Sequence, residues 1–154
     1  MKKITALILA AVLLLSLTAC GGKPETKKID LNALYQGYVQ YLPEMFLADE
    51  ATMLNFVGVE AADCTQVIIA ISGEGMRTDE VWLIEAKDEA ALEKIKGLAG
   101  VRQVAKEDET VSYAPDQYAV VTESELLTNG LYLAYLVSPD VDAMKAAFEG
   151  AFNQ

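Results

Sequence analysis

The chain has 154 residues, of which 53% are apolar, and this length is enough for one globular domain but too short for two full ones. It carries 12 Lys and Arg against 23 Asp and Glu, and the resulting formal charge of −11 disfavours nucleic acid as a partner. The sequence contains no His, the commonest general base and zinc ligand, so most hydrolase and metalloenzyme templates lack a central residue. We therefore expect no metal site and no cofactor.

The first segment of the chain has the pattern of a secretory signal. Met1-Lys2-Lys3 is a short cationic start, and residues 4–17 form an apolar run without a charged residue. This run is shorter than the about 20 apolar residues that a membrane-spanning helix needs, so we expect it to be cleaved rather than kept as an anchor.

The signal ends in Leu17-Thr18-Ala19-Cys20, which resembles the lipobox of bacterial lipoproteins. The resemblance implies that residues 1–19 are removed as a lipoprotein signal peptide and that the Cys20 sulfur carries a diacylglycerol. Two acyl chains give a stable membrane attachment where one is marginal. The sequence thus predicts a protein anchored through its lipid on the extracytoplasmic face of the cell membrane; the alternative is an ordinary secretory signal in which Cys20 occurs by chance.

Residues 20–29 form a short linker between the lipid and the folded domain. This segment has adjacent glycines, a helix-disfavouring Pro24 and no apolar face. A fully extended chain of roughly ten residues reaches at most about 35 Å, so the domain must lie close to the membrane. Residues 30–154 are expected to form one α+β domain.

The first part of this domain has clear helix and hairpin signals. Asp30 is a candidate N-cap for a helix whose apolar residues recur at helical spacing until Pro43. A loop follows, and residues 53–59 are apolar but too short to assign to a helical turn or a strand. Residues 65–72 and 80–86 are rich in β-branched and aromatic residues and predict a hairpin. Asp88 caps a second predicted helix, which two glycines weaken before a polar stretch at residues 106–112.

The second part of the domain repeats this order. Residues 118–122 and 131–137 predict a second strand pair with Asn129-Gly130 as the turn between the strands, and Asp140 opens a last helix. The order is therefore a helix followed by two strand-strand-helix units, which is either an internal repeat or a coincidence.

We predict from these elements an α+β fold with an antiparallel four-stranded sheet packed by amphipathic helices. The strands are apolar on both faces, whereas a half-solvated sheet shows a cleaner alternation. Either the N-terminal helix or another molecule must therefore cover the second face.

With these elements in place, the chain resembles the bacterial lipoprotein family described as domain of unknown function 4358. The resemblance rests on the order and spacing of Leu42-Pro43-Glu44-Met45, Asp49-Glu50, Phe56-Val57-Gly58-Val59, Asp79-Glu80-Val81, Tyr113-Ala114-Pro115 and Gly130-Leu131-Tyr132. The sequence departs at Phe56, where the family more often has Tyr. The family has no established activity; the resemblance implies an exported lipoprotein of Gram-positive, largely anaerobic bacteria.

Few residues suggest chemistry. Cys64 is the only thiol besides Cys20 and has no His to activate it, so we expect a buried, inert side chain. Clustered carboxylates are candidates for calcium but lack the spacing of an EF-hand loop, so we interpret them as solvated acidic surface. These clusters are Asp49-Glu50, Asp79-Glu80, Glu107-Asp108-Glu109 and Asp140-Val141-Asp142.

Aromatic residues offer the remaining candidate site. An exposed subset of the tyrosines, Tyr113, Tyr118 and Tyr132, is a candidate binding surface, because such rings combine an apolar face with a polar rim. The leading hypothesis is a non-enzymatic binding or protein-interaction module of the cell envelope. The alternatives are a lipoprotein that captures a sugar, peptide or metal, and a wall hydrolase that uses a carboxylate pair.

Overall fold

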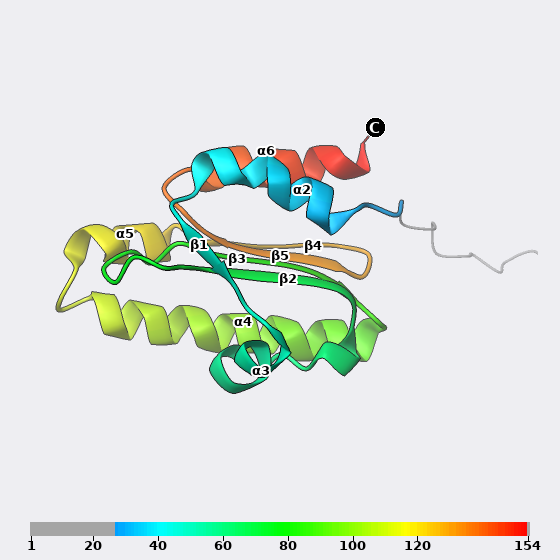
Figure 1. Ribbon diagram of the computed structural model, residues 1–154, viewed down its shortest axis with the longest axis horizontal. Coiled ribbons are helices and arrows are strands. Elements are labelled where there is room, and N and C mark those ends of the chain that lie inside the picture. Colours follow the sequence, from blue (N-terminus) through cyan, green and yellow to red (C-terminus); the bar gives the residue numbers. More distant parts are fainter. Residues whose placement is uncertain (1–26, 154) are drawn as a thin grey trace, which may run out of the picture.

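The computed structural model describes residues 27–153, so the signal, Cys20 and most of the linker lie outside the described residues. The described chain forms three layers, with helices on both faces of one antiparallel sheet (Figure 1). The α+β prediction is confirmed, but the sheet has five strands, in the order β1-β2-β3-β5-β4, and not four. No helix within residues 27–153 is long and apolar enough to cross a membrane.

The elements have the following bounds. The strands are β1 Met45–Leu47, β2 Cys64–Ser72, β3 Glu80–Ala86, β4 Glu125–Asn129 and β5 Tyr132–Val137. The helices are α2 Leu31–Tyr38, α3 Glu50–Thr52, α4 Glu89–Thr110, α5 Pro115–Thr122 and α6 Val141–Phe152. The additional strand β1 is too short to show a pattern in the sequence.

Both faces of the sheet are buried, which explains why its strands are apolar on both sides. Trp82 and Ile84 of β3 point into the core beneath α4, whereas Val81 and Leu83 point into the core beneath α2 and α6. The N-terminal helix α2 therefore covers the second face together with α6, as Figure 1 shows, and the first of the two explanations is confirmed. Each face has its own closed hydrophobic core.

Helix α2 begins where the sequence predicts. The Asp30 carboxylate accepts hydrogen bonds from the backbone N–H groups of Asn32 and Ala33 at 2.8 and 3.2 Å, which satisfies two otherwise unpaired donors. Toward its end, the Tyr38 hydroxyl donates to the Met144 carbonyl at 2.9 Å and joins α2 to α6. The α-helix ends at Tyr38, and one 3₁₀ turn follows before Pro43.

Helix α4 is longer than predicted, because the polar stretch at residues 106–112 continues it to Thr110. The Asp88 carboxylate caps the helix by accepting from the Ala91 N–H at 2.8 Å, as expected. An added Cβ at Gly97 or Gly100 would meet no atom within 4 Å, so both glycines lie on the open side. The helix continues through both glycines because its other face packs on the sheet.

The segment 118–122 is helical, and the prediction of a strand there was wrong. Pro115 at the first position of α5 has the fixed φ that suits a helix start, and Val121 is buried in the core beneath α4. The strand that forms a hairpin with β5 is β4, which lies closer to the turn than the predicted strand. Gly130 in that turn has φ +58°, so the Asn129-Gly130 turn signal is confirmed.

The segment 53–59, which the sequence left undecided, contains a helical turn. Residues Met53–Val57 form a π-helical turn after α3 that ends at Gly58, whose φ of +77° suits glycine.

The strand-strand-helix order does occur twice, but α4 and α6 lie on opposite faces of the sheet (Figure 1). Asp140 precedes α6 without accepting a capping hydrogen bond, unlike Asp88.

Candidate functional site

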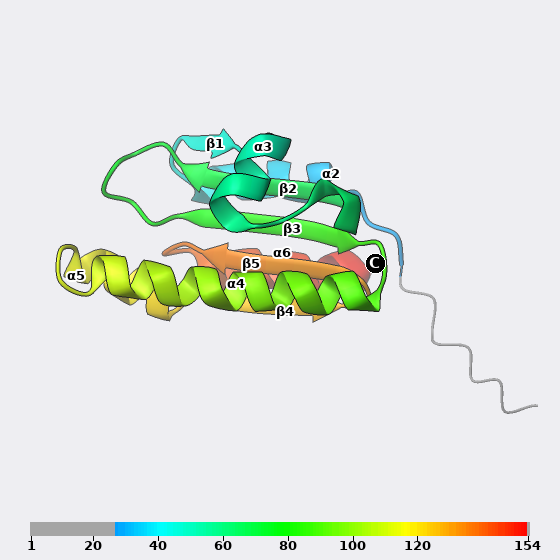
Figure 2. The same ribbon diagram turned by 90° about the horizontal axis from the view of Figure 1, so that it is seen from below.

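A hollow of about 240 Å³ lies at one end of the molecule, where three segments meet. These segments are the β2–β3 connection, the second half of α4 and the link between α4 and α5. Figures 1 and 2 show this end opposite to the end at which the described chain begins. The residues of the hollow on which the argument depends are Met76, Arg77, Thr78, Arg102, Lys106 and Tyr113.

A buried ion network forms the floor of this hollow. Glu80 is fully buried at the start of β3, and its carboxylate accepts from Arg102 Nε and Nη2 at 2.9–3.1 Å. The Lys106 Nζ atom lies 2.9 Å from Glu80 Oε2, and the Trp82 indole N–H donates to Oε1 at 2.8 Å. The network joins α4 to the central strand, so the position of the hollow is fixed by charge pairing as well as by apolar packing.

Burial and charge pairing shift the pKa values of the charged groups in this network in opposite directions. Burial alone raises the pKa of the Glu80 carboxyl, but hydrogen bonds and charge from Arg102 and Lys106 outweigh it, so the pKa lies below its usual value. Burial lowers the pKa of the Lys106 ammonium, and the nearby Glu80 carboxylate offsets only part of this effect. The Glu80 carboxyl is therefore ionised at neutral pH.

Further hydrogen bonds extend the network to the neighbouring loops. Lys106 Nζ donates to the Thr78 carbonyl at 2.9 Å, and the Thr78 N–H and hydroxyl both donate to Gln117 Oε1 of α5, at 3.0 and 3.1 Å. The guanidinium of Arg77 donates twice to the buried Asp79 carboxylate, at 2.8 and 3.1 Å. The loops around the hollow are thus held by the same cluster that forms its floor.

The rim of the hollow exposes large side chains. Tyr113 is 85% exposed and Met76 is 69% exposed, while Arg77 keeps part of its side chain in solvent. We call these three residues the distal rim. Tyr, Met and Arg are enriched in protein–protein interfaces, because each offers a large contact area or several hydrogen-bond donors. A fixed floor beneath exposed side chains of this kind is suited to binding a partner.

The comparison with protein families identifies the chain. The family described as domain of unknown function (DUF4358) matches residues 33–138, which is more than half of the sequence. The chain belongs to this family. No curated protein and no solved structure matches it. The DUF4358 match begins within α2 and ends before α6, so it includes all five strands, the ion network and the distal rim.

The three predicted binding tyrosines do not share a surface in this DUF4358 chain. Tyr113 belongs to the distal rim, and Tyr118 lies half-buried in α5. Tyr132 is buried on the opposite face of the sheet, where its hydroxyl accepts from the Ile29 N–H at 3.3 Å and its ring contacts Phe152 edge to face. The prediction of a joint tyrosine surface is therefore wrong for Tyr132, since alternation along β5 directs it into the core.

The structure describes only one of the two cysteines, Cys64. Cys20 lies outside the described residues. Cys64 begins β2, its thiol donates weakly to the Glu60 carbonyl at 3.6 Å, and burial raises its pKa to about 11. The thiolate that would act as a nucleophile is therefore disfavoured, in line with the expected inert side chain.

The structure bears on the acidic clusters in two respects, metal binding and exposure to solvent. Within residues 27–153, no group of three or more Asp, Glu or Cys side chains is arranged to hold a metal ion. Asp79 and Glu80 are buried and ion-paired, so the interpretation of this cluster as solvated surface was wrong. Sequence reasoning missed Arg102 and Lys106 as partners of Glu80, although they continue the helical spacing of Ile95 and Ala99 on the buried face of α4.

Proposed function

We propose that this protein is a lipoprotein anchored on the extracytoplasmic face of the cell membrane, where it serves as a non-enzymatic protein-binding module. The observation that carries the proposal is the distal rim, which lies at the far end of the long axis from the start of the described chain (Figures 1 and 2). An anchor at one end and a binding surface at the other would present that surface away from the membrane.

Contacts near residue 27 support this orientation. Lys27 Nζ donates to the Ala151 carbonyl at the end of α6, at 2.9 Å, and the Ile29 backbone N–H donates to the Tyr132 hydroxyl. These contacts fix where the chain leaves the domain. With the lipid on Cys20 and roughly ten linker residues of at most about 35 Å, the end that carries α2 and the C-terminus of α6 would face the membrane.

The dimensions of the hollow favour a protein partner over a small ligand. Small-molecule sites enclose about 300–1,000 Å³, whereas this hollow measures about 240 Å³ and its most exposed side chains stand around it. A hollow of this size fits one side chain of a partner. Aromatic and Arg side chains around such a depression resemble the few residues that carry most of the binding energy of an interface.

Site-specific photo-crosslinking in intact cells tests the proposal. A photoreactive amino acid replaces Tyr113 in one strain and Gln36, an exposed residue of α2, in the other. We expect a discrete crosslinked product of fixed mass from position 113 and not from position 36, and we expect Met76→Ala to weaken it. Equal products from both positions, or none from position 113, would contradict a binding role for the distal rim.

A further inference from the structure

The strand β4 forms an unprotected edge of the sheet. It pairs with β5 only, in a continuous register from Glu125↔Leu136 to Asn129↔Tyr132. Because two residues connect Asn129 to Tyr132, these residues form a hydrogen-bonded pair, and such pairs alternate along an antiparallel ladder. The backbone N–H and C=O groups of Leu126 and Thr128 therefore point away from β5, toward the open edge.

The two edges of the sheet differ in how they are protected. Proteins blunt exposed edges with very short strands, Lys, Pro or bulges. The opposite edge, β1, has only three residues and follows Pro43 closely. β4 has five residues, contains neither Lys nor Pro, and pairs with β5 without a bulge. Of the two, β4 is the edge that can accept another strand.

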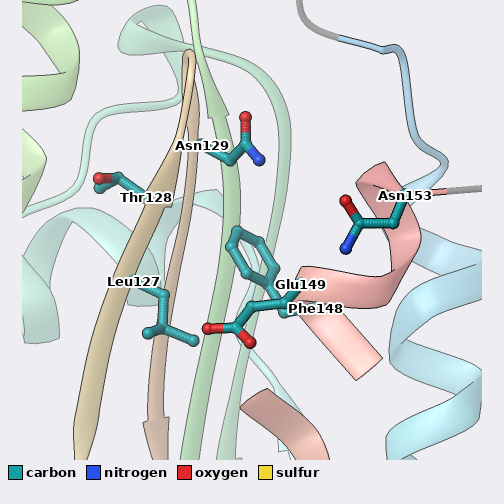
Figure 3. A pocket seen from close by; sticks show the side chains of 6 residues that line it. All are labelled: Leu127, Thr128, Asn129, Phe148, Glu149 and Asn153. Carbon is teal, nitrogen blue, oxygen red and sulfur yellow. The ribbon is translucent and has the colours of Figure 1, made fainter. Parts of the chain in front are cut away.

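A hollow of about 340 Å³ lies directly beside this edge, between β4 and α6. Figure 3 shows the Leu127 side chain and the Phe148 ring as its apolar part, with the Glu149 carboxylate lying over it and the side chains of Asn129 and Asn153 at its far end. Side chains of an added strand alternate between the two faces of a sheet. Every second side chain of such a strand would therefore point toward this hollow.

Charge indicates what kind of strand fits. The whole chain has a net charge of −11, and Glu123 and Glu149 lie exposed near this edge, while Glu125 is paired with Lys145 at 2.7 Å. A second copy would bring the same acidic side chains together. Antiparallel pairing of two β4 strands would also place the two chain starts at opposite ends, because the strands follow the long axis (Figure 1).

We propose that β4 binds an extended, positively charged peptide segment of another protein as an added strand, with an apolar side chain in the hollow between β4 and α6. The backbone of Leu126 and Thr128 supplies the hydrogen bonds, Leu127 and Phe148 receive the apolar side chain, and Glu149 pairs with a cationic one. This surface is separate from the distal rim, so the inference goes beyond the proposed function and does not depend on it.

Nuclear magnetic resonance of the ¹⁵N-labelled full chain in neutral detergent micelles tests the inference. The probe is the peptide acetyl-KVTVKVTVK-amide, and its controls replace every Lys by Glu or the central Lys by Pro. We expect saturable shifts of the amides of residues 125–129 and 148–149, and at least tenfold weaker binding of both controls. Shifts spread over other elements, or equal binding of the Glu peptide, would overturn the inference.

Two variants of the protein sharpen the test. Thr128→Pro removes one outward N–H group without touching the β4–β5 ladder, and we expect it to abolish binding. Glu149→Gln keeps the backbone intact and should weaken binding several-fold, whereas Glu50→Gln on α3 should not change it. Unchanged binding by Glu149→Gln, or shifts of the same amides with protein concentration in the absence of peptide, would contradict a cationic partner.

Discussion

Glu80 lies at the centre of the buried ion network. Its carboxylate is fully buried, yet it contacts Arg102, Lys106 and the Trp82 indole, so the buried negative charge is paired with donors from three side chains. Breaking a buried ion pair by removing one partner typically costs about 3–5 kcal/mol, because the remaining charge stays buried without compensation. Here two cations would remain, and both have little access to solvent.

We therefore expect Glu80→Gln to reduce the free energy of unfolding by about 3 kcal/mol, since the amide keeps the shape of the side chain but not its charge. Urea denaturation followed by Trp82 fluorescence measures the change. Glu74→Gln, an exposed substitution in the same connection, should alter it by no more than about 0.5 kcal/mol. An equally small effect of Glu80→Gln would show that the ion network does not stabilise the fold.

The same residue makes a prediction about pH. Because the pKa of Glu80 is lower in the folded protein than its usual value of 4.5, the carboxylate stabilises the fold above the unfolded pKa and stops doing so as pH falls through the folded pKa. The stability difference between wild type and Glu80→Gln should be constant near neutral pH and should shrink below about pH 4.5. A difference that grows toward acid would contradict the lowered pKa.

At the scale of the elements, the two aspartates that precede α2 and α6 form a matched pair. Asp30 accepts two backbone hydrogen bonds, while Asp140 accepts no capping bond. We expect Asp30→Ala to reduce the free energy of unfolding by about 1 kcal/mol and Asp140→Ala to change it by less than half of that. Thermal unfolding of both variants measures this difference. Equal losses would mean that the cap geometry does not distinguish the two helices.

The sequence predicts elements well where local chemistry and packing agree. The caps at Asp30 and Asp88, the β2–β3 hairpin and the Asn129-Gly130 turn are confirmed, because each has a residue that only one local structure satisfies. The segment 118–122 was mispredicted because its β-branched residues favour a strand in isolation, whereas burial of Val121 in the core beneath α4 selects a helix.

The candidate site was harder to predict than the fold. The sequence singled out Tyr113 and Tyr132 alike, because nothing local distinguishes an exposed tyrosine from one that alternation along its strand directs into the core. Glu80 looked like surface charge since its partners lie 22 or more residues away on α4. Arg102 and Lys106 are spaced from Ile95 so that all three lie on one face of α4. This spacing would have predicted the ion network if charged residues had been considered on the buried face of the helix.

At the scale of the whole molecule, two surfaces differ in chemistry and place. The distal rim exposes Tyr113, Met76 and Arg77 above a charged floor, whereas the β4 edge combines free backbone groups with acidic side chains. The first lies at the far end from residue 27, and the second runs along one side of the sheet. Both surfaces would be accessible on a domain that a short linker holds at the end where residue 27 lies.

Metabolic labelling with an alkyne fatty acid tests the anchored, outward-facing arrangement most directly. We expect wild type and Cys64→Ala to incorporate the label and to sediment with membranes, and we expect Cys20→Ala to remain unlabelled. An unlabelled wild-type protein, or label that persists in Cys20→Ala, would contradict the lipid anchor and with it the orientation proposed for the distal rim.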